Sequence, residues 1–278
     1  EVAVITSIDA DHLDIYGDME HLREAFKIFA SQVSGTVIAR YGLDITQADT
    51  KAKVYTYGAA EPNADFYAEL IDDFGHFNLH YPGGVIEGCK VGIPGWVNVE
   101  NAVAASAIAL TYGLEPEKVK AALEAFEGVK RRFDIHLNTP ECSYIDDYAH
   151  HPAEIDACIK SIRHLYPAKK ICGVFQPHLY SRTKDFAKEF AQSLSTIDDV
   201  ILLEIYPARE KPIEGVTSEW LMGKVQTKRA LVPPGILAKY LRERVKNCVT
   251  HGKDCVVITM GAGDIDRQVK HIAKALQI

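Results

Sequence analysis

The first residues whose types could do chemistry surround a single histidine. Three aspartates flank His12 within residues 9–14 (DADHLD), directly after the apolar run at 2–8. A neutral imidazole nitrogen and carboxylate oxygens are both suitable ligands for a divalent cation. The segment is therefore either a metal site or a polar turn that caps the helix after it.

A second candidate is the pair of side-chain amides at Asn98 and Asn101. Because they are three residues apart, they share one face of the helix predicted over 98–113. Each amide offers both a donor and an acceptor, so the pair could bind the edge of a purine base. The alternative is that Asn98 only caps the start of the helix.

Arg132 lies in the basic segment KRRF at 130–133, where the sequence pattern changes. A guanidinium group can bind phosphate through two parallel hydrogen bonds. Paired basic residues are also common on protein surfaces. The segment alone therefore does not separate a phosphate site from a solvated surface.

Two further polar segments follow predicted strands, DDYAHHP at 146–152 and QPHLYSR at 176–182. An aspartate there could accept hydrogen bonds from ribose hydroxyls, and the histidines could bind a carboxylate or a phosphate. The alternatives are a helix cap in the first segment and a solvated loop in the second. Because both strand ends carry such groups, we favour a binding site.

Regular patterns predict the elements that would position these groups. In the first part of the chain we expect strands at 2–8 and 36–40, an antiparallel meander over 53–91, and helices at 18–33, 98–113 and 115–128. After residue 131, apolar strands alternate with helices, which predicts βαβ units and a mostly parallel sheet. Ligands of such sheets bind beyond the carboxyl ends of the strands, where four polar segments lie, at 146–152, 176–182, 205–212 and 260–266.

The composition excludes several classes of protein. The 278 residues carry a net charge of -7, which argues against a general nucleic-acid binder. No apolar run approaches the length of a membrane span, and no signal peptide opens the chain. The six cysteines form no C-x-x-C pair, which favours reduced thiols in the cytoplasm. We expect neither nucleic-acid nor membrane partners.

Two phosphate-binding motifs are also absent from the sequence. GAGDID at 261–266 lacks the third glycine of a dinucleotide loop and lies at the end of the chain. No G-x-x-x-x-G-K-[ST] loop occurs in these residues.

Seven segments, taken in order, resemble the Mur ligase family. They are DADHLDIYG, PGWVNVENAVAA, GVKRRFD, IDDYAHHPAEI, FQPHLYSRT, IYPAREKPIEGV and GAGDI. The most specific are DDYAHHP and FQPHxYSRT. They are more similar to the alanine-adding ligase of the family than to its murein-tripeptide recycling ligase or to folylpolyglutamate synthetase.

The resemblance implies an α/β fold with two domains. Residues 1–131 would be the C-terminal part of the central ATP-binding domain. Residues 132–278 would be the Rossmann-like C-terminal ligase domain, with a mostly parallel sheet. The UDP-binding domain and phosphate loop of the family would precede residue 1. We therefore expect this fragment alone to be inactive, and its first domain to be either remodelled or paired with a second copy as a homodimer.

The resemblance also implies an activity in peptidoglycan synthesis. An ATP-dependent ligase would join L-alanine to the lactyl carboxylate of UDP-N-acetylmuramate through an acyl phosphate, with ATP and Mg²⁺ as cofactors. Two alternatives remain open, which are the murein-peptide recycling ligase of the same family and a non-catalytic nucleotide-binding module.

Eight residues match functional positions of the family. They are His12 for magnesium, Asn98 and Asn101 for adenine, Asp147 for ribose, Arg132 for the γ-phosphate, and Tyr148, His150 and Arg182 for the alanine and acyl-phosphate site. Arg132, His150 and Arg182 would be catalytic, and the last two would also bind substrate with Tyr148.

Two positions depart from the family pattern. Val97 stands where the family often has His, and Leu179 stands where it often has Arg. The second change removes a cationic contact to phosphate or carboxylate, so Arg182 would carry more of that role.

Overall fold

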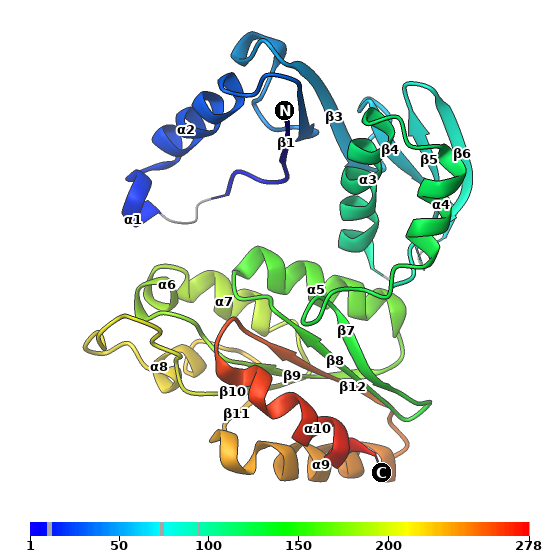
Figure 1. Cartoon of the computed structure of the whole chain (residues 1–278). Coiled ribbons are helices and arrows are strands. Elements are labelled where there is room, and N and C mark those ends of the chain that lie inside the picture. Colours follow the sequence, from blue (N-terminus) through cyan, green and yellow to red (C-terminus); the bar gives the residue numbers. More distant parts are fainter. Residues whose placement is uncertain (10–12, 73–74, 94, 278) are drawn as a thin grey trace. The chain divides into compact units, whose positions relative to one another are not determined.

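The computed structural model describes residues 1–9, 13–72, 75–93 and 95–277. The chain divides into two compact units, Glu1–Glu127 (unit 1) and Gly128–Ile278 (unit 2), and each is described by itself (Figure 1). Each unit contains a six-stranded sheet with helices, which confirms the predicted α/β class. Within the described residues, no helix is both long and apolar enough to cross a membrane.

Unit 1 is built on a sheet with strand order β1-β2-β3-β4-β5-β6. Its elements are β1 (Val2–Ile5), α1 (Leu13–Tyr16), α2 (Met19–Ser31), β2 (Thr36–Arg40), the 3-10 helix η1 (Gln47–Asp49), β3 (Lys53–Ala59), β4 (Phe66–Leu70), β5 (His76–Tyr81), β6 (Gly84–Lys90), α3 (Trp96–Thr111) and α4 (Pro116–Glu124).

The direction of strand β3 differs from the prediction. Strands β1 to β4 pair in parallel, and β4, β5 and β6 pair antiparallel. The predicted meander over 53–91 is therefore correct for β4 to β6 and wrong for β3. Alternating apolar residues predict a strand, but they do not specify its neighbour.

Alternate residues of β2 face two different layers of helices. Val37 and Ala39 pack in the cluster that includes Ala30 of α2. Ile38 packs in the cluster that includes Val99 and other residues of α3. The period of two along the strand thus buries both faces of the sheet, as expected for a parallel sheet.

Unit 2 contains the second sheet, with strand order β11-β10-β9-β12-β8-β7. Its elements are β7 (Asp134–Asn138), β8 (Cys142–Asp147), α5 (Pro152–Leu165), β9 (Lys170–Phe175), α6 (Tyr180–Asp185), α7 (Ala187–Leu194), β10 (Asp199–Leu202), α8 (Ser218–Met222), β11 (Lys228–Leu231), α9 (Pro234–Thr250), β12 (Cys255–Met260), η2 (Asp264–Gln268) and α10 (Val269–Leu276). All pairs are parallel except that of the edge strand β7, which confirms the predicted mostly parallel sheet.

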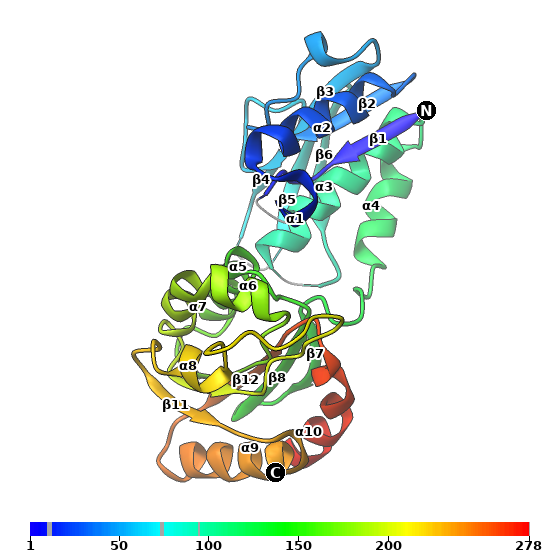
Figure 2. The same cartoon turned by 90° about the vertical axis from the view of Figure 1, so that its left-hand side faces the viewer.

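Helices cover both faces of this sheet. One core cluster joins the sheet to α5, α7 and α8, and another joins its opposite face to α9 and α10. Figures 1 and 2 show α5 above the strands of unit 2 and α9 below them. All six residues of the central strand β12 are buried between these layers.

Phe190 provides a test of the core that packs α7 onto the sheet. Its side chain is 1% exposed, and its ring centroid lies 5.3 Å from that of Phe175. We expect Phe190→Ala to lower the free energy of unfolding of unit 2 by about 3–5 kcal/mol, because it leaves a cavity. Ile236→Ala, at a position 53% exposed, should change it by less than about 0.5 kcal/mol. Urea denaturation compares the two, and equal losses would contradict this packing.

Candidate functional site

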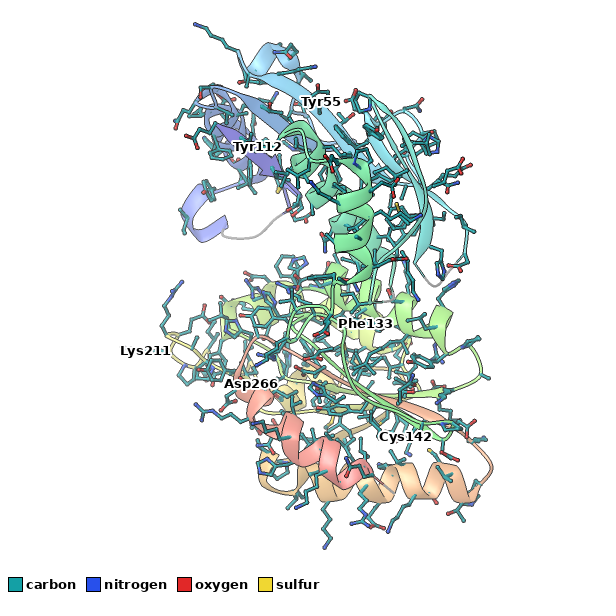
Figure 3. The ribbon with its side chains drawn as sticks, turned by 45° about the vertical axis from the view of Figure 1, so that its right-hand side comes forward. Tyr55, Tyr112, Phe133, Cys142, Lys211 and Asp266 are labelled. Carbon is teal, nitrogen blue, oxygen red and sulfur yellow. The ribbon has the colours of Figure 1, made fainter. Side chains whose placement is uncertain are left out.

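At the carboxyl end of β12 the chain passes to the opposite face of the sheet from the one it takes after the neighbouring strands. This strand lies between β8 and β9. The chain continues from β8 and β9 to helices on one face, but from β12 to α10 on the other. In open α/β sheets, ligands bind beside the strand ends where such a reversal occurs. Figure 3 labels both ends of this sheet, with Cys142 at the start of β8 and Asp266 beyond the end of β12.

Four ring side chains form a row across this edge. The ring centroids of Tyr148 and His150 are 5.3 Å apart, and those of His150 and His178 are 6.1 Å apart. The His178 ring stacks on Tyr206 at 5.7 Å. The row brings together residues that follow β8, β9 and β10. It therefore unites three of the predicted segments, 146–152, 176–182 and 205–212.

Two arginines lie against the Tyr148 end of the row. The guanidinium carbons of Arg131 and Arg132 lie 5.1 Å and 5.2 Å from the centroid of the Tyr148 ring. Such cation–π contacts orient a guanidinium group without neutralising its charge. Arg132, the predicted phosphate ligand, is exposed, so its charge remains available to an anion.

The turn that carries Arg132 is strained on both sides. Arg131 and Phe133 have φ angles of +62° and +53°. The left-handed region costs a non-glycine residue about 1–3 kcal/mol, so the surrounding structure must hold it. Phe133 is buried in the core of unit 2, and the Tyr148 N–H donates to the Arg131 carbonyl at 2.7 Å.

Arg131 is held by the ends of two strands. Its Nε donates to Asp146 Oδ2 at 3.2 Å, and its Nη2 donates to the Gly261 carbonyl at 2.5 Å. The other oxygen of Asp146 accepts from the Thr259 hydroxyl at 2.6 Å. Burial raises the pKa of Asp146, while Thr259 and Arg131 act in the opposite direction. No local sequence pattern predicts this pair, because its two residues are 15 positions apart.

Asp147 is bound by two backbone amides. Its Oδ2 accepts from Phe133 N–H at 2.8 Å, and its Oδ1 accepts from Ala149 N–H at 2.7 Å. Burial raises the pKa of Asp147, although these amides and the charge of Arg132 lower it. The carboxylate thus fixes the same strained turn. A carboxylate oxygen has two lone pairs, so the predicted contact with ribose stays compatible with these bonds.

The backbone after β8 is fixed by a glutamate of α5. Glu154 Oε2 accepts from the backbone N–H groups of His150 and His151, at 3.0 and 3.2 Å. His151 is the N-cap residue of α5, so the segment forms a helix start as well as a candidate site.

The ring of His150 has acceptors on one side. Its Nδ1 lies 3.0 Å from the Tyr148 carbonyl and 3.2 Å from Glu154 Oε2. Two acceptors beside Nδ1 favour the tautomer that carries the proton there. Nε2 is then the nitrogen with the acceptor lone pair.

Arg182 lies on α6 near His178. Burial, and then the positive charges of Arg182 and His150, lower the pKa of His178. His178 is therefore neutral at pH 7. The structure thus brings Tyr148, His150 and Arg182 to one edge, as predicted, while their chemical roles stay predictions.

The predicted adenine-binding residues lie in unit 1. Helix α3 begins at Trp96, and its N-cap is Gly95 with φ +117°. The alternative that Asn98 is the N-cap is therefore wrong, because Asn98 is the third residue of the helix and its N–H donates to the Gly95 carbonyl at 3.0 Å. Asn98 is half-buried and Asn101 is exposed. Glycine at the cap explains the difference, since the left-handed φ suits it.

The predicted magnesium ligand, His12, lies outside the described residues. Within the part of the chain that the structure describes, no group of three His, Cys, Asp or Glu residues could hold a metal ion. Magnesium binding thus stays a prediction.

Comparisons with known proteins cover both units. A model of the Mur ligase middle domain matches residues 1–109, and a model described as Mur ligase, glutamate ligase domain matches residues 131–263. The chain is 44% identical to a UDP-N-acetylmuramate–L-alanine ligase of Porphyromonas gingivalis, over 99% of this chain and 60% of the relative. The chain thus spans 60% of the length of this curated relative.

Two solved structures share the fold. The UDP-N-acetylmuramate–alanine ligase of Thermotoga maritima is 24% identical with a TM-score of 0.74, covering 99% of this chain and 59% of that one. The MurF ligase of Thermotoga maritima in complex with ADP is 19% identical with a TM-score of 0.73, covering 99% and 62%.

The Arg131–Asp146 pair gives a prediction with a defined pH dependence. Arg131→Met leaves a buried carboxylate without its cation, so we expect the free energy of unfolding at pH 7 to fall by about 3 kcal/mol. The pKa of Asp146 is already raised in the folded state and should rise further in this variant. Protonation then favours the folded state, so the loss should shrink as the pH falls from 7 to 5.

Urea denaturation at both pH values measures these losses. Arg242→Met, which removes an exposed cation from α9, is the matched control and should have little effect. A loss in Arg131→Met that is small at pH 7, or that grows as the pH falls, would show that the pair does not hold the turn.

Proposed function

The chain belongs to the Mur ligase family, and on that premise we propose that it forms the ATP-binding middle and C-terminal domains of an enzyme that joins L-alanine to UDP-N-acetylmuramate. One observation carries the proposal, which is 44% identity along 99% of the chain to a UDP-N-acetylmuramate–L-alanine ligase. The activity is assigned to the whole protein that contains this chain. We place it in the cytoplasm, where ATP and UDP-linked sugars are made available to such enzymes.

The proposed chemistry activates a carboxylate. The γ-phosphoryl group of ATP is transferred to the lactyl carboxylate, which gives an acyl phosphate and ADP. The amine of L-alanine then forms a bond to the acyl carbon, loses a proton, and expels inorganic phosphate. Both steps develop negative charge on phosphoryl oxygens, so cationic side chains are required. Arg132 and Arg182 are the side chains that we assign to this role.

His150 is proposed to accept the proton of the attacking amine. An α-ammonium group cannot attack an acyl carbon until it loses a proton. Two acceptors lie beside Nδ1 of His150 and favour a proton on that nitrogen, so Nε2 is the basic nitrogen. Tyr148 lies between this ring and the Arg132 guanidinium, so it can orient both the substrate and Arg132.

Nucleotide binding is supported by the ADP complex of the similar MurF ligase. We assign Asn98 and Asn101 to adenine, and the remaining lone pairs of Asp147 to ribose. Magnesium is proposed with His12 as a ligand. Because His12 lies outside the described residues, no step of the proposal passes through the metal.

Arg182 gives the first test of this function. In the protein encoded by the complete gene, Arg182→Ala should lower kcat/KM for alanine-dependent phosphate release by about 100-fold or more, because a charge-stabilising donor is lost. Lys184→Ala removes an exposed cation from the same helix and should have little effect. A coupled phosphate-release assay measures both, and near-normal turnover of Arg182→Ala would exclude the role assigned here.

The choice of acceptor gives the second test. With ATP and UDP-N-acetylmuramate, we expect free L-alanine to support phosphate release and a murein tripeptide to support little. A preference for the tripeptide would assign the protein to the recycling branch of the family. Nucleotide binding without phosphate release from any acceptor would indicate a non-catalytic module.

A further inference from the structure

The loop after β10 places a cation beside the row of rings, and we propose that Arg209 binds the carboxylate of the acceptor amino acid. Arg209 would then be a specificity-determining residue of the reaction. This inference rests on the proposed function, since it concerns the acceptor of the same ligase.

Backbone hydrogen bonds attach the start of this loop to the segment after β9. Tyr206 N–H donates to the Pro177 carbonyl at 2.8 Å, and Leu179 N–H donates to the Tyr206 carbonyl at 2.9 Å. Together they form a short parallel bridge between His178 and Tyr206, whose rings stack. The loop is therefore fixed at this point, three residues before Arg209.

A second anchor follows Arg209 directly. The carboxylate of Glu210 accepts hydrogen bonds from the backbone N–H of Ser181, at 3.0 Å, and from the Ser181 hydroxyl. Between the anchors, Ala208 has a φ of +49°, and Glu210 N–H donates to the Pro207 carbonyl at 2.8 Å. Arg209 thus lies at the corner of a tight turn that is held at both ends to the segment containing His178.

The charge balance around His178 favours an anion. Arg209 is exposed, and within the described part of the chain its guanidinium forms no hydrogen bond or ion pair with another residue. Its positive charge and that of Arg182 both act on His178, and His150 adds to them. Glu210 is the acid that opposes them, and its carboxylate is already engaged by Ser181. A guanidinium in this setting suits a carboxylate or a phosphate.

The order of residues along the row favours the carboxylate of the acceptor. Arg132, which we assign to phosphate, contacts Tyr148 at one end of the row, and Tyr206 is at the other end. His150, the proposed base, lies between them and so marks the position of the reacting amine. In an α-amino acid a single carbon separates the amine from the carboxylate. The carboxylate therefore extends past His150, on the side where Arg182 and Arg209 lie.

Leu179 provides an internal test of this placement. It is apolar, it is the N-cap residue of α6, and its backbone is bound to Tyr206. An arginine at position 179 would therefore start from a segment attached to the Arg209 loop. If a cation at this edge binds the carboxylate, Leu179→Arg should restore part of the affinity for L-alanine that Arg209→Ala removes.

The experiment measures steady-state kinetics of the protein from the complete gene, with L-alanine varied at saturating ATP and UDP-N-acetylmuramate. Arg209→Ala should raise KM for L-alanine by about 10- to 100-fold, the effect of losing a charged hydrogen bond. The kcat should change little, which also shows that the variant is folded. Arg209→Lys should have a smaller effect, and Arg209→Ala with Leu179→Arg should recover part of the loss.

L-alaninamide, which lacks the carboxylate, is the probe for the contact itself. The wild-type protein should prefer L-alanine over L-alaninamide, and Arg209→Ala should reduce this preference. The matched control is Lys211→Ala, two residues along the same loop, where Figure 3 labels Lys211 at the outer edge of unit 2. It should leave KM and the preference unchanged.

Three results would overturn the inference. They are an unchanged KM for L-alanine in Arg209→Ala, an unchanged preference over L-alaninamide, or a rise in KM confined to ATP or UDP-N-acetylmuramate, which would identify a phosphate contact. Failure of the proposed function is a different result, because the wild-type protein itself would then show no alanine-dependent phosphate release.

Discussion

The ion pair between Arg131 and Asp146 is the interaction on which the polar edge of unit 2 depends. Arg131 bridges the end of β8, through Asp146, and the residue after β12, through the Gly261 carbonyl. The Asp146 carboxylate is buried and the Arg131 side chain is 19% exposed. Desolvation therefore offsets much of the attraction, and the pair matters more for what it positions than for its net stability. It holds a left-handed turn in place, and that turn sets Arg132 against Tyr148.

Close packing at the end of β12 supports the same edge. A Cβ atom on Gly263 would lie 2.5 Å from Gln176 Oε1 and 2.7 Å from the Cβ of Tyr206, so only glycine fits there. Gln176 in turn accepts from Ile265 N–H and donates to Asp264, both at 2.9 Å. The glycines of GAGDID therefore allow three strand ends to approach one another.

Local sequence signals predicted where helices and strands occur better than they predicted which strands pair. The strand at 36–40 has the predicted bounds, because the preference of a β-branched run for strands acts within the segment. The parallel pairing of β3 was not predicted, since both faces of that strand are covered and its pattern gives no direction. Asn98 was considered as a cap because asparagine often caps helices, but Gly95 takes that position.

The sequence by itself determined the α/β class, the resemblance to the Mur ligases and the segments that could do chemistry. It placed Tyr148, His150 and Arg182 after predicted strands, and it predicted that they share one edge because the carboxyl ends of parallel strands lie together. Only the tertiary structure decided which strand ends are neighbours, since β12 enters between β8 and β9. The bond from Arg131 to Gly261 joins residues 130 positions apart, and the loop after β10 is attached to the segment after β9 by the bridge between Tyr206 and His178. Such contacts depend on how the strands are ordered in space, and no local pattern encodes that order.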